Sequence, residues 1–97
     1  MRSSVKNDIR SVLDKAHSAV RKKNYHLLDG LSNRLNHAIA IYQDKEVSLC
    51  AVAIFALGKI FTNDRYFTDS GFQEFRNDVL SNLKAASKAM KADNLAQ

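Results

Sequence analysis

An uninterrupted apolar run near the middle of the chain constrains the fold more than any other feature. Nine consecutive residues, Leu49 through Leu57, are apolar, and Ile60 and Phe61 extend the run. The apolar residues do not alternate with polar ones, and no polar stripe runs along one side. A helix that is apolar all round is typical of a buried position. The run therefore predicts a buried central helix against which the other elements pack.

The composition favours helices along the whole chain. Its 97 residues include no proline and three glycines, and 45% of them are hydrophobic. Proline interrupts helices, so its absence suits a helical chain with short connections. A β-sandwich of this length would need more turn-forming residues. We therefore expect an all-α protein that forms one domain, residues 1–97, with enough apolar side chains to fill a core.

Four segments carry apolar residues at the spacing of one helix face. Asp44 precedes the third segment and is expected to cap its N-terminus. Short connections between helices favour an antiparallel up-and-down four-helix bundle with the apolar third helix buried. The predicted helices span about residues 4–22, 26–42, 45–62 and 70–91.

The third predicted helix has an apolar side for which a small bundle offers no partner. Each helix of such a bundle contacts two neighbours and turns another side to water, yet this helix has no polar side. Either the following loop and the first helix cover it, or a second copy of the protein does. We expect a homodimer, with another protein as the alternative partner. The residues expected at this interface are Leu49, Val52, Phe55, Ile60, Tyr66 and Phe67.

The positive charge of the chain is concentrated in its first helix. The net charge is +5, and residues 1–23 hold seven Lys or Arg against two Asp. Cations at helical spacing can bind phosphates, so nucleic acid is a second candidate partner. The segment lacks the interleaved aromatic residues that stack on bases, and a solvated charged face fits the same pattern. The candidate contacts are Arg2, Lys6, Arg10, Arg21, Lys22 and Lys23.

Carboxylate and imidazole groups occur in two pairs at helical spacing. Asp14 and His17 are three residues apart, as are His26 and Asp29. Di-iron bundles use such pairs, but they also need inward-facing glutamates on the other two helices, which the core positions here do not offer. His37 lies beside the apolar stripe of the second helix, a position that also suits an ordinary surface residue. We therefore predict a non-enzymatic protein with no metal and no cofactor, and an enzyme with a polar site near His26, Asp29 and His37 is the remaining alternative.

The single cysteine, Cys50, lies inside the apolar run. It cannot form an internal disulfide and is expected to be a small buried hydrophobic residue, which suits a reducing compartment. The first ten residues carry charge where a signal peptide would be apolar. The central run of about 14 residues is shorter than the ~20 that span a bilayer. We expect a cytoplasmic protein that does not interact with membranes.

The segment from Leu31 to Phe61, LSNRLNHAIAIYQDKEVSLCAVAIFALGKIF, resembles helix pairs in small uncharacterised helical proteins of archaea. It also resembles the first two core helices of HEPN bundles. HEPN ribonucleases carry an arginine followed a few residues later by a histidine, near the end of the bundle. The match here, Arg21 to His26 in RKKNYH, precedes the similar segment. The resemblance therefore implies a dimeric, inactive member of such a group or a related RNA-binding protein.

Overall fold

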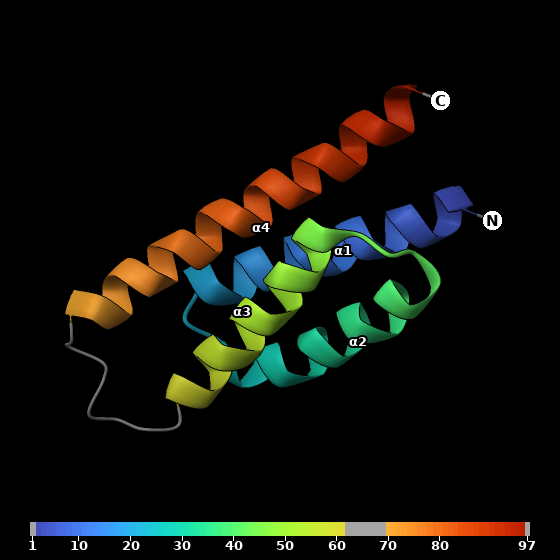
Figure 1. Ribbon diagram of the computed structural model, residues 1–97. Helices are drawn as coiled ribbons and strands as arrows, with labels where there is room; N and C mark the ends of the chain where they lie inside the picture. Colours follow the sequence, from blue (N-terminus) through green and yellow to red (C-terminus); the bar gives the residue numbers. More distant parts are fainter. Residues whose placement is uncertain (1, 62–69, 97) are drawn as a thin grey trace.

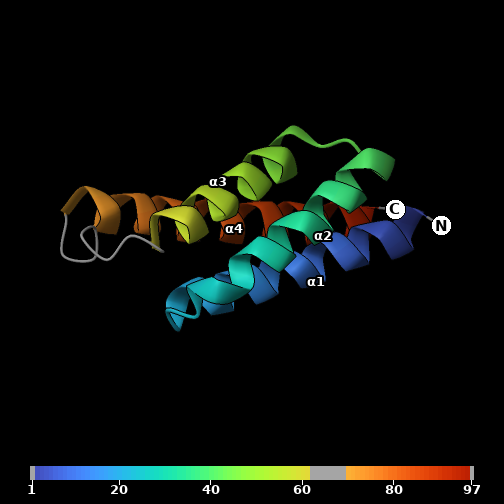
Figure 2. The same ribbon diagram turned by 90° about the horizontal axis from the view of Figure 1, so that it is seen from below.

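The computed structural model describes the backbone of residues 2–61 and 70–96 and the side chains of residues 5–60 and 70–90. Four helices run alternately up and down, so the start of α1 and the end of α4 lie at the same end of the bundle (Figures 1 and 2). The predicted all-α antiparallel four-helix bundle is confirmed. Its elements are α1 (Arg2–Arg21), the 3₁₀ turn η1 (Tyr25–Leu27), α2 (Leu28–Ile41), α3 (Lys45–Phe61) and α4 (Ser70–Ala96).

The predicted helix boundaries differ from the observed ones mainly at the second and fourth helices. The segment predicted to start near residue 26 begins with η1, and the α-helix follows only at Leu28. The fourth helix extends to Ala96 rather than ending near residue 91, since Ala92, Leu95 and Ala96 are good helix formers. The third helix begins at the predicted residue, Lys45. Before it, Asp44 Oδ1 accepts a hydrogen bond from the Val47 N–H at 3.0 Å. The predicted cap at Asp44 is therefore confirmed.

One apolar cluster connects all four helices. Each helix contributes large side chains that are fully buried, and α3 packs between α2 and α4. Small residues let α2 and α3 approach closely: Ser32 is buried, and its hydroxyl donates to the Ala51 carbonyl at 3.0 Å. The largest core side chains include Ile9, Leu13, Leu28, Leu35, Ile54, Leu57, Val79 and Leu83.

Burial of α3 on all sides, as the apolar run predicted, does not hold for the single chain. One side of the helix is buried, through Val47, Cys50, Ala51, Ile54 and Leu57. The opposite side faces solvent, because α2 and α4 flank the helix and no described part of the chain packs over its third side. The apolar pattern thus predicted the helix correctly, but the bundle supplies partners for only part of its surface.

A left-handed residue ends α1. Lys23 has φ 63°, the Lys23 N–H donates to the Val20 carbonyl at 3.1 Å, and the Asn24 N–H donates to the Ala19 carbonyl at 2.8 Å. These two bonds form a Schellman motif, in which glycine is the favoured left-handed residue. A lysine there carries the steric cost of its Cβ.

Replacing Lys23 with glycine is therefore expected to raise the free energy of unfolding by about 0.5–1 kcal/mol. Urea unfolding followed by circular dichroism measures this change. The control is Lys15→Gly inside α1, which is expected to cost about 1 kcal/mol. A Lys23→Gly variant as destabilised as Lys15→Gly would contradict this account of the helix end.

Candidate interaction surfaces

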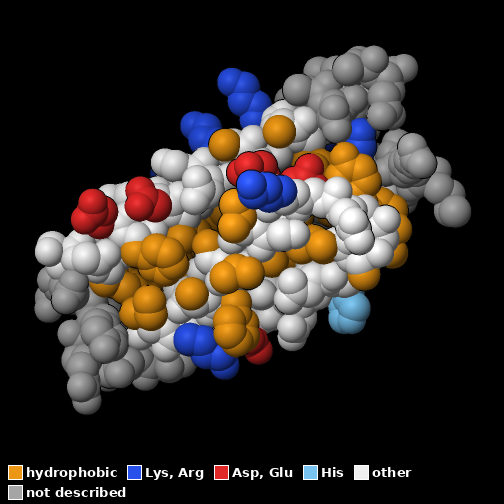
Figure 3. All heavy atoms as spheres, viewed as in Figure 1, with side chains coloured by type: hydrophobic (Ala, Val, Ile, Leu, Met, Phe, Trp, Pro, Cys, Tyr) orange, Lys and Arg blue, Asp and Glu red, His pale blue; other side chains and the backbone are white. Residues whose placement is uncertain are grey.

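The outer side of α3 exposes three large apolar side chains. Leu49 is 54% exposed, Val52 is 67% exposed and Phe55 is 44% exposed. Lys59 lies at the end of this row, with Nζ 5.1 Å from the centroid of the Phe55 ring. Apolar side chains gather over α3 and along its border with α4 (Figure 3). Leu49, Val52 and Phe55 are called the α3 face below.

The other three residues expected at the interface, Ile60, Tyr66 and Phe67, do not extend the α3 face within the described residues. Ile60 is half-buried and packs against the core. Tyr66 and Phe67 lie outside the described residues. The α3 face is therefore a surface within one helix. Its three side chains follow one another at intervals of three residues on the outer side of α3, and apolar side chains gathered on one face are candidates for an interaction site, whereas scattered single ones are not.

The basic residues of the first helix separate into three groups. The side chain of Lys6 is 3% exposed, and Nζ lies 5.6 Å from the centroid of the Tyr42 ring. Lys6 is thus an interior residue of the α1–α2 contact and does not belong to a basic surface. Arg21, Lys22 and Lys23 are exposed at the end of α1, and Arg10 is half-buried. The side chain of Arg2 lies outside the described residues.

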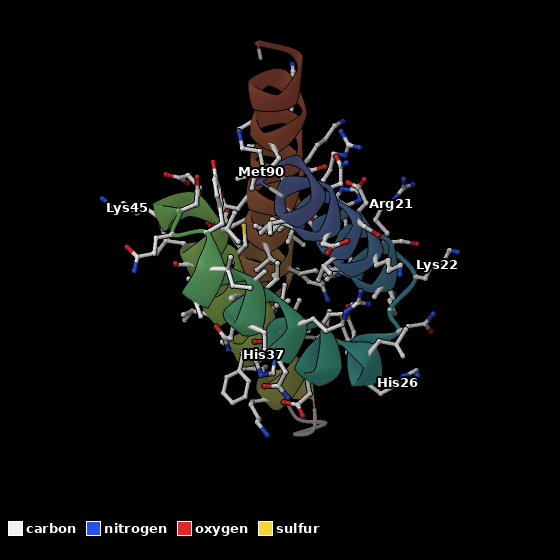
Figure 4. All side chains as sticks on the ribbon, turned by 90° about the vertical axis from the view of Figure 1, so that its right-hand side faces the viewer. Arg21, Lys22, His26, His37, Lys45 and Met90 are labelled. Carbon is white, nitrogen blue, oxygen red and sulfur yellow. The ribbon has the colours of Figure 1, made fainter. Side chains whose placement is uncertain are left out.

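Cations from α4 join Arg10 in a groove between α1 and α4. The groove is lined by Arg10, Asp14, His17, Lys84, Ser87 and Lys88. The Ser87 hydroxyl donates to Asp14 Oδ1, which links the two helices across the groove. His17 also lines a second hollow, which it shares with Arg21 and Lys22 at the end of α1. The groove residues together with Arg21 and Lys22 are called the basic groove below. Arg21 and Lys22 lie on the opposite side of the molecule from Lys45 of α3 (Figure 4).

The surroundings of His17 in the basic groove lower the pKa of its imidazole. Burial lowers the pKa of His17, and the charges of Arg21 and Lys84 lower it further, while Asp14 acts in the opposite direction. Cations of both helices, Arg21 of α1 and Lys84 of α4, therefore act on the His17 imidazole. The pair Asp14–His17 is a part of this groove, and Asp14 already accepts a hydrogen bond from Ser87.

The other candidate residues do not converge on a reaction centre. His26, Asp29 and His37 are all exposed, and His26 and His37 belong to different elements, η1 and α2. His37 lines a shallow groove between α1 and α2 together with Asp8 and Arg34. Within the described residues, no group of three or more His, Cys, Asp or Glu side chains could hold a metal ion.

Cys50 is held as a neutral thiol. It is 2% exposed, and its Sγ donates to the Asn82 carbonyl of α4 at 3.6 Å. Burial raises the pKa of the thiol to about 11, and the negative charges of Glu46 and Asp44 act in the same direction. Since the thiolate is the reactive form, this cysteine is suited to packing rather than to nucleophilic chemistry.

Alkylation of Cys50 by iodoacetamide at pH 8 is expected to be at least about 100-fold slower in the folded protein than in denaturant, because both the raised pKa and burial suppress the thiolate. Mass spectrometry of quenched time points measures the two rates. Equal rates in the folded and unfolded protein would show that Cys50 is accessible and would contradict its place in the core.

Arg76 of α4 is a structural residue that sequence reasoning missed. Its Nε donates to the Tyr25 hydroxyl at 2.9 Å, and its Nη2 donates to the Val20 and Arg21 carbonyls at 3.0 and 3.3 Å. Tyr25 also packs edge-on against Phe72, with ring centroids 6.1 Å apart. Arg76 thus connects α4 to the C-terminal end of α1 and to the turn η1 that follows it. Its position among Phe72, Val79 and Leu83 at helical spacing was the available signal, because a cation on an apolar stripe needs a partner.

Comparisons with known proteins leave the chain without a match. No family model, no curated protein and no solved structure matches it, so the resemblance to HEPN bundles gains no support. Among the described residues, no helix is both long enough and apolar enough to cross a membrane. Functional proposals therefore rest on the α3 face and the basic groove.

Proposed function

We propose that this protein is a non-enzymatic interaction module that forms a homodimer through the α3 face. The observation that carries the proposal is the row of Leu49, Val52 and Phe55 on the outer side of one helix. Removing such surface from water is the main favourable term in protein association. A cytoplasmic location is part of the proposal and is supported by the single buried thiol of Cys50.

Replacing Val52 with glutamate tests the proposal. Val52 is 67% exposed, so the change removes little packing within one chain, and glutamate has a higher helix propensity than valine. At the centre of a dimer, the same carboxylate would be buried without a partner. Val52→Glu is therefore expected to sediment as a monomer while its circular dichroism keeps the helical signal.

Ile41→Glu is the matched control, because Ile41 is 75% exposed at the end of α2. This variant is expected to sediment with the same mass as the wild-type protein. If Val52→Glu and the wild-type protein form equally stable dimers, the α3 face is not the interface. If Ile41→Glu dissociates the dimer and Val52→Glu does not, the interface lies at α2.

Nucleic-acid binding is a second candidate function, and the basic groove is the observation that favours it. The structure places Lys84 and Lys88 of α4 beside Arg10 of α1, although the two lysines lie far from the first helix in the sequence. Convergent cations bind the phosphate backbone by releasing counterions, so the affinity should fall steeply with salt.

Fluorescence anisotropy with labelled single-stranded RNA at several salt concentrations tests this second candidate. Reversing the charge of Lys84 to glutamate is expected to weaken binding and to reduce its salt dependence. Lys45→Glu is the matched control, since Lys45 lies on the opposite side of the molecule from Arg21 and Lys22 of the basic groove (Figure 4). Equal losses in the two variants would indicate a general effect of net charge and would remove the basic groove as a binding site.

A further inference from the structure

An open hollow lies along the border between α1 and α2. Its volume is about 480 Å³, and small-molecule sites in proteins have volumes of ~300–1,000 Å³. Its uncharged lining is largely apolar: Ala19 and Leu31 are buried, whereas Leu27 is 47% exposed and leaves apolar surface that a bound molecule could cover. The apolar part consists of Ala19, Leu27, Gly30 and Leu31. The surface is called the α1–α2 hollow below.

Gly30 keeps the α1–α2 hollow open. Glycine destabilises a helix relative to alanine, so a glycine within α2 calls for a reason. The two common reasons, a left-handed backbone and a close neighbour, do not apply at Gly30. Its φ is not positive, and a Cβ added there would meet no atom within 4 Å. The effect that remains is space, because a larger side chain at this position would occupy the hollow.

Three cations line the α1–α2 hollow beside its apolar residues. Lys15 and Lys22 come from α1 and Arg34 comes from α2. All three side chains are exposed, and among the described residues no Asp or Glu lines this hollow. An apolar lining with a few charged groups of one sign is suited to an organic molecule that carries the opposite charge.

The carboxylates near this border do not cancel the positive charge. Asp14 lines the basic groove between α1 and α4. Asp29 projects about 100° around α2 from its neighbour Gly30, since an α-helix has 3.6 residues per turn. Asp8 lines the next hollow along the border between α1 and α2, together with Arg34. With Asp8 counted, three positive charges still stand against one negative charge.

The direction of the helices places two of the cations at the same end. Because α1 and α2 are antiparallel (Figure 2), Arg34 lies toward Lys15, whereas Leu27 lies toward Lys22. Cations from two helices therefore approach one end of the hollow, and the apolar residues extend away from it. The planar guanidinium of Arg34 can donate two parallel hydrogen bonds to a carboxylate or a sulfonate.

We infer that the α1–α2 hollow binds a small organic anion with an apolar body. The anionic group lies between Lys15 and Arg34, and the body covers Leu27, Gly30 and Leu31. All of these residues belong to α1, η1 and α2 of one chain, so the inference does not depend on the proposed homodimer. It adds a small-molecule site to a protein whose other proposed partners are macromolecules.

Fluorescence titration with two dyes of the same apolar body tests the class of ligand. The probes are anilinonaphthalene sulfonate and phenylnaphthylamine, which lacks the sulfonate. The sulfonated dye is expected to bind the wild-type protein at least ~10-fold more tightly, because only it forms charge-assisted hydrogen bonds with Lys15 and Arg34. Equal affinities for the two dyes, or no binding of the sulfonated dye, would overturn the inference.

Gly30→Leu tests the location by filling the hollow. It is expected to weaken binding of the sulfonated dye at least ~10-fold, because the leucine takes the place of the apolar body. The variant should be no less stable to urea than the wild-type protein, since leucine is a better helix former than glycine and its Cβ meets no atom. Asn36→Leu is the matched control, an exposed position of α2 outside the hollow. Equal dye affinities in these two variants would remove the hollow as the site.

Arg34→Met tests the anionic contact. This variant is expected to weaken binding of the sulfonated dye at least ~5-fold and to leave the uncharged dye unaffected. Lys84→Met removes the same charge from the basic groove and is the matched control, so equal losses would indicate a general effect of net charge and overturn the inference. Val52→Glu should keep the wild-type dye affinity, whereas a loss in that variant with none in Gly30→Leu would place the dye on the α3 face instead.

Discussion

Replacing Leu57 with alanine is expected to lower the free energy of unfolding by about 2–5 kcal/mol. Leu57 is fully buried on the inner side of α3, in the cluster that joins the helices. Its truncation removes apolar burial and leaves a cavity that surrounding side chains fill only in part. Urea unfolding at a fixed protein concentration, followed by circular dichroism, measures the loss.

Ile41→Ala is the control for this prediction, because it truncates a side chain that is 75% exposed. Its effect should stay within about 0.5 kcal/mol. A loss at Leu57 no larger than that at Ile41 would mean that the inner side of α3 is not the core of the bundle.

Replacing Arg76 with methionine is expected to cost about 1.5–3 kcal/mol of unfolding free energy, the range for hydrogen bonds that involve a charged group. The change removes the hydrogen bonds of Arg76 to Tyr25 and to the end of α1. Methionine keeps much of the apolar length of the side chain, so the loss reports the guanidinium. Thermal and urea unfolding both measure it.

Lys84→Met on the same helix is the matched control for Arg76, since Lys84 is exposed. It should change the unfolding free energy by less than about 0.5 kcal/mol. Arg76→Lys should recover only part of the loss, because an ammonium group does not reproduce the planar fork of the guanidinium. Full stability in Arg76→Met would show that the link from α4 to the end of α1 contributes nothing.

The helices and their order could be predicted from the sequence because apolar periodicity and capping residues are local signals. Asp44 marked the start of α3 correctly, and the apolar run from Leu49 to Leu57 marked the helix that carries the α3 face. The turn η1 was missed, since a 3₁₀ turn and the first turn of an α-helix have similar local patterns.

The partners of the polar residues inside the bundle could not be predicted, because they are distant in the sequence. Lys6 faces Tyr42, Ser32 donates to Ala51, and Arg76 reaches the end of α1. Each of these contacts depends on which helices lie side by side in the bundle. The apolar periodicity within one helix does not determine which helices become neighbours. The same reason explains why Lys84 and Lys88 were not expected beside Arg10.

Multi-angle light scattering of the wild-type protein at about 10–100 μM tests the central claim most directly. The proposed homodimer predicts a mass of twice the 10.9 kDa chain, with a shift toward the single-chain mass on dilution. A mass of 10.9 kDa over the whole concentration range would contradict self-association through Leu49, Val52 and Phe55.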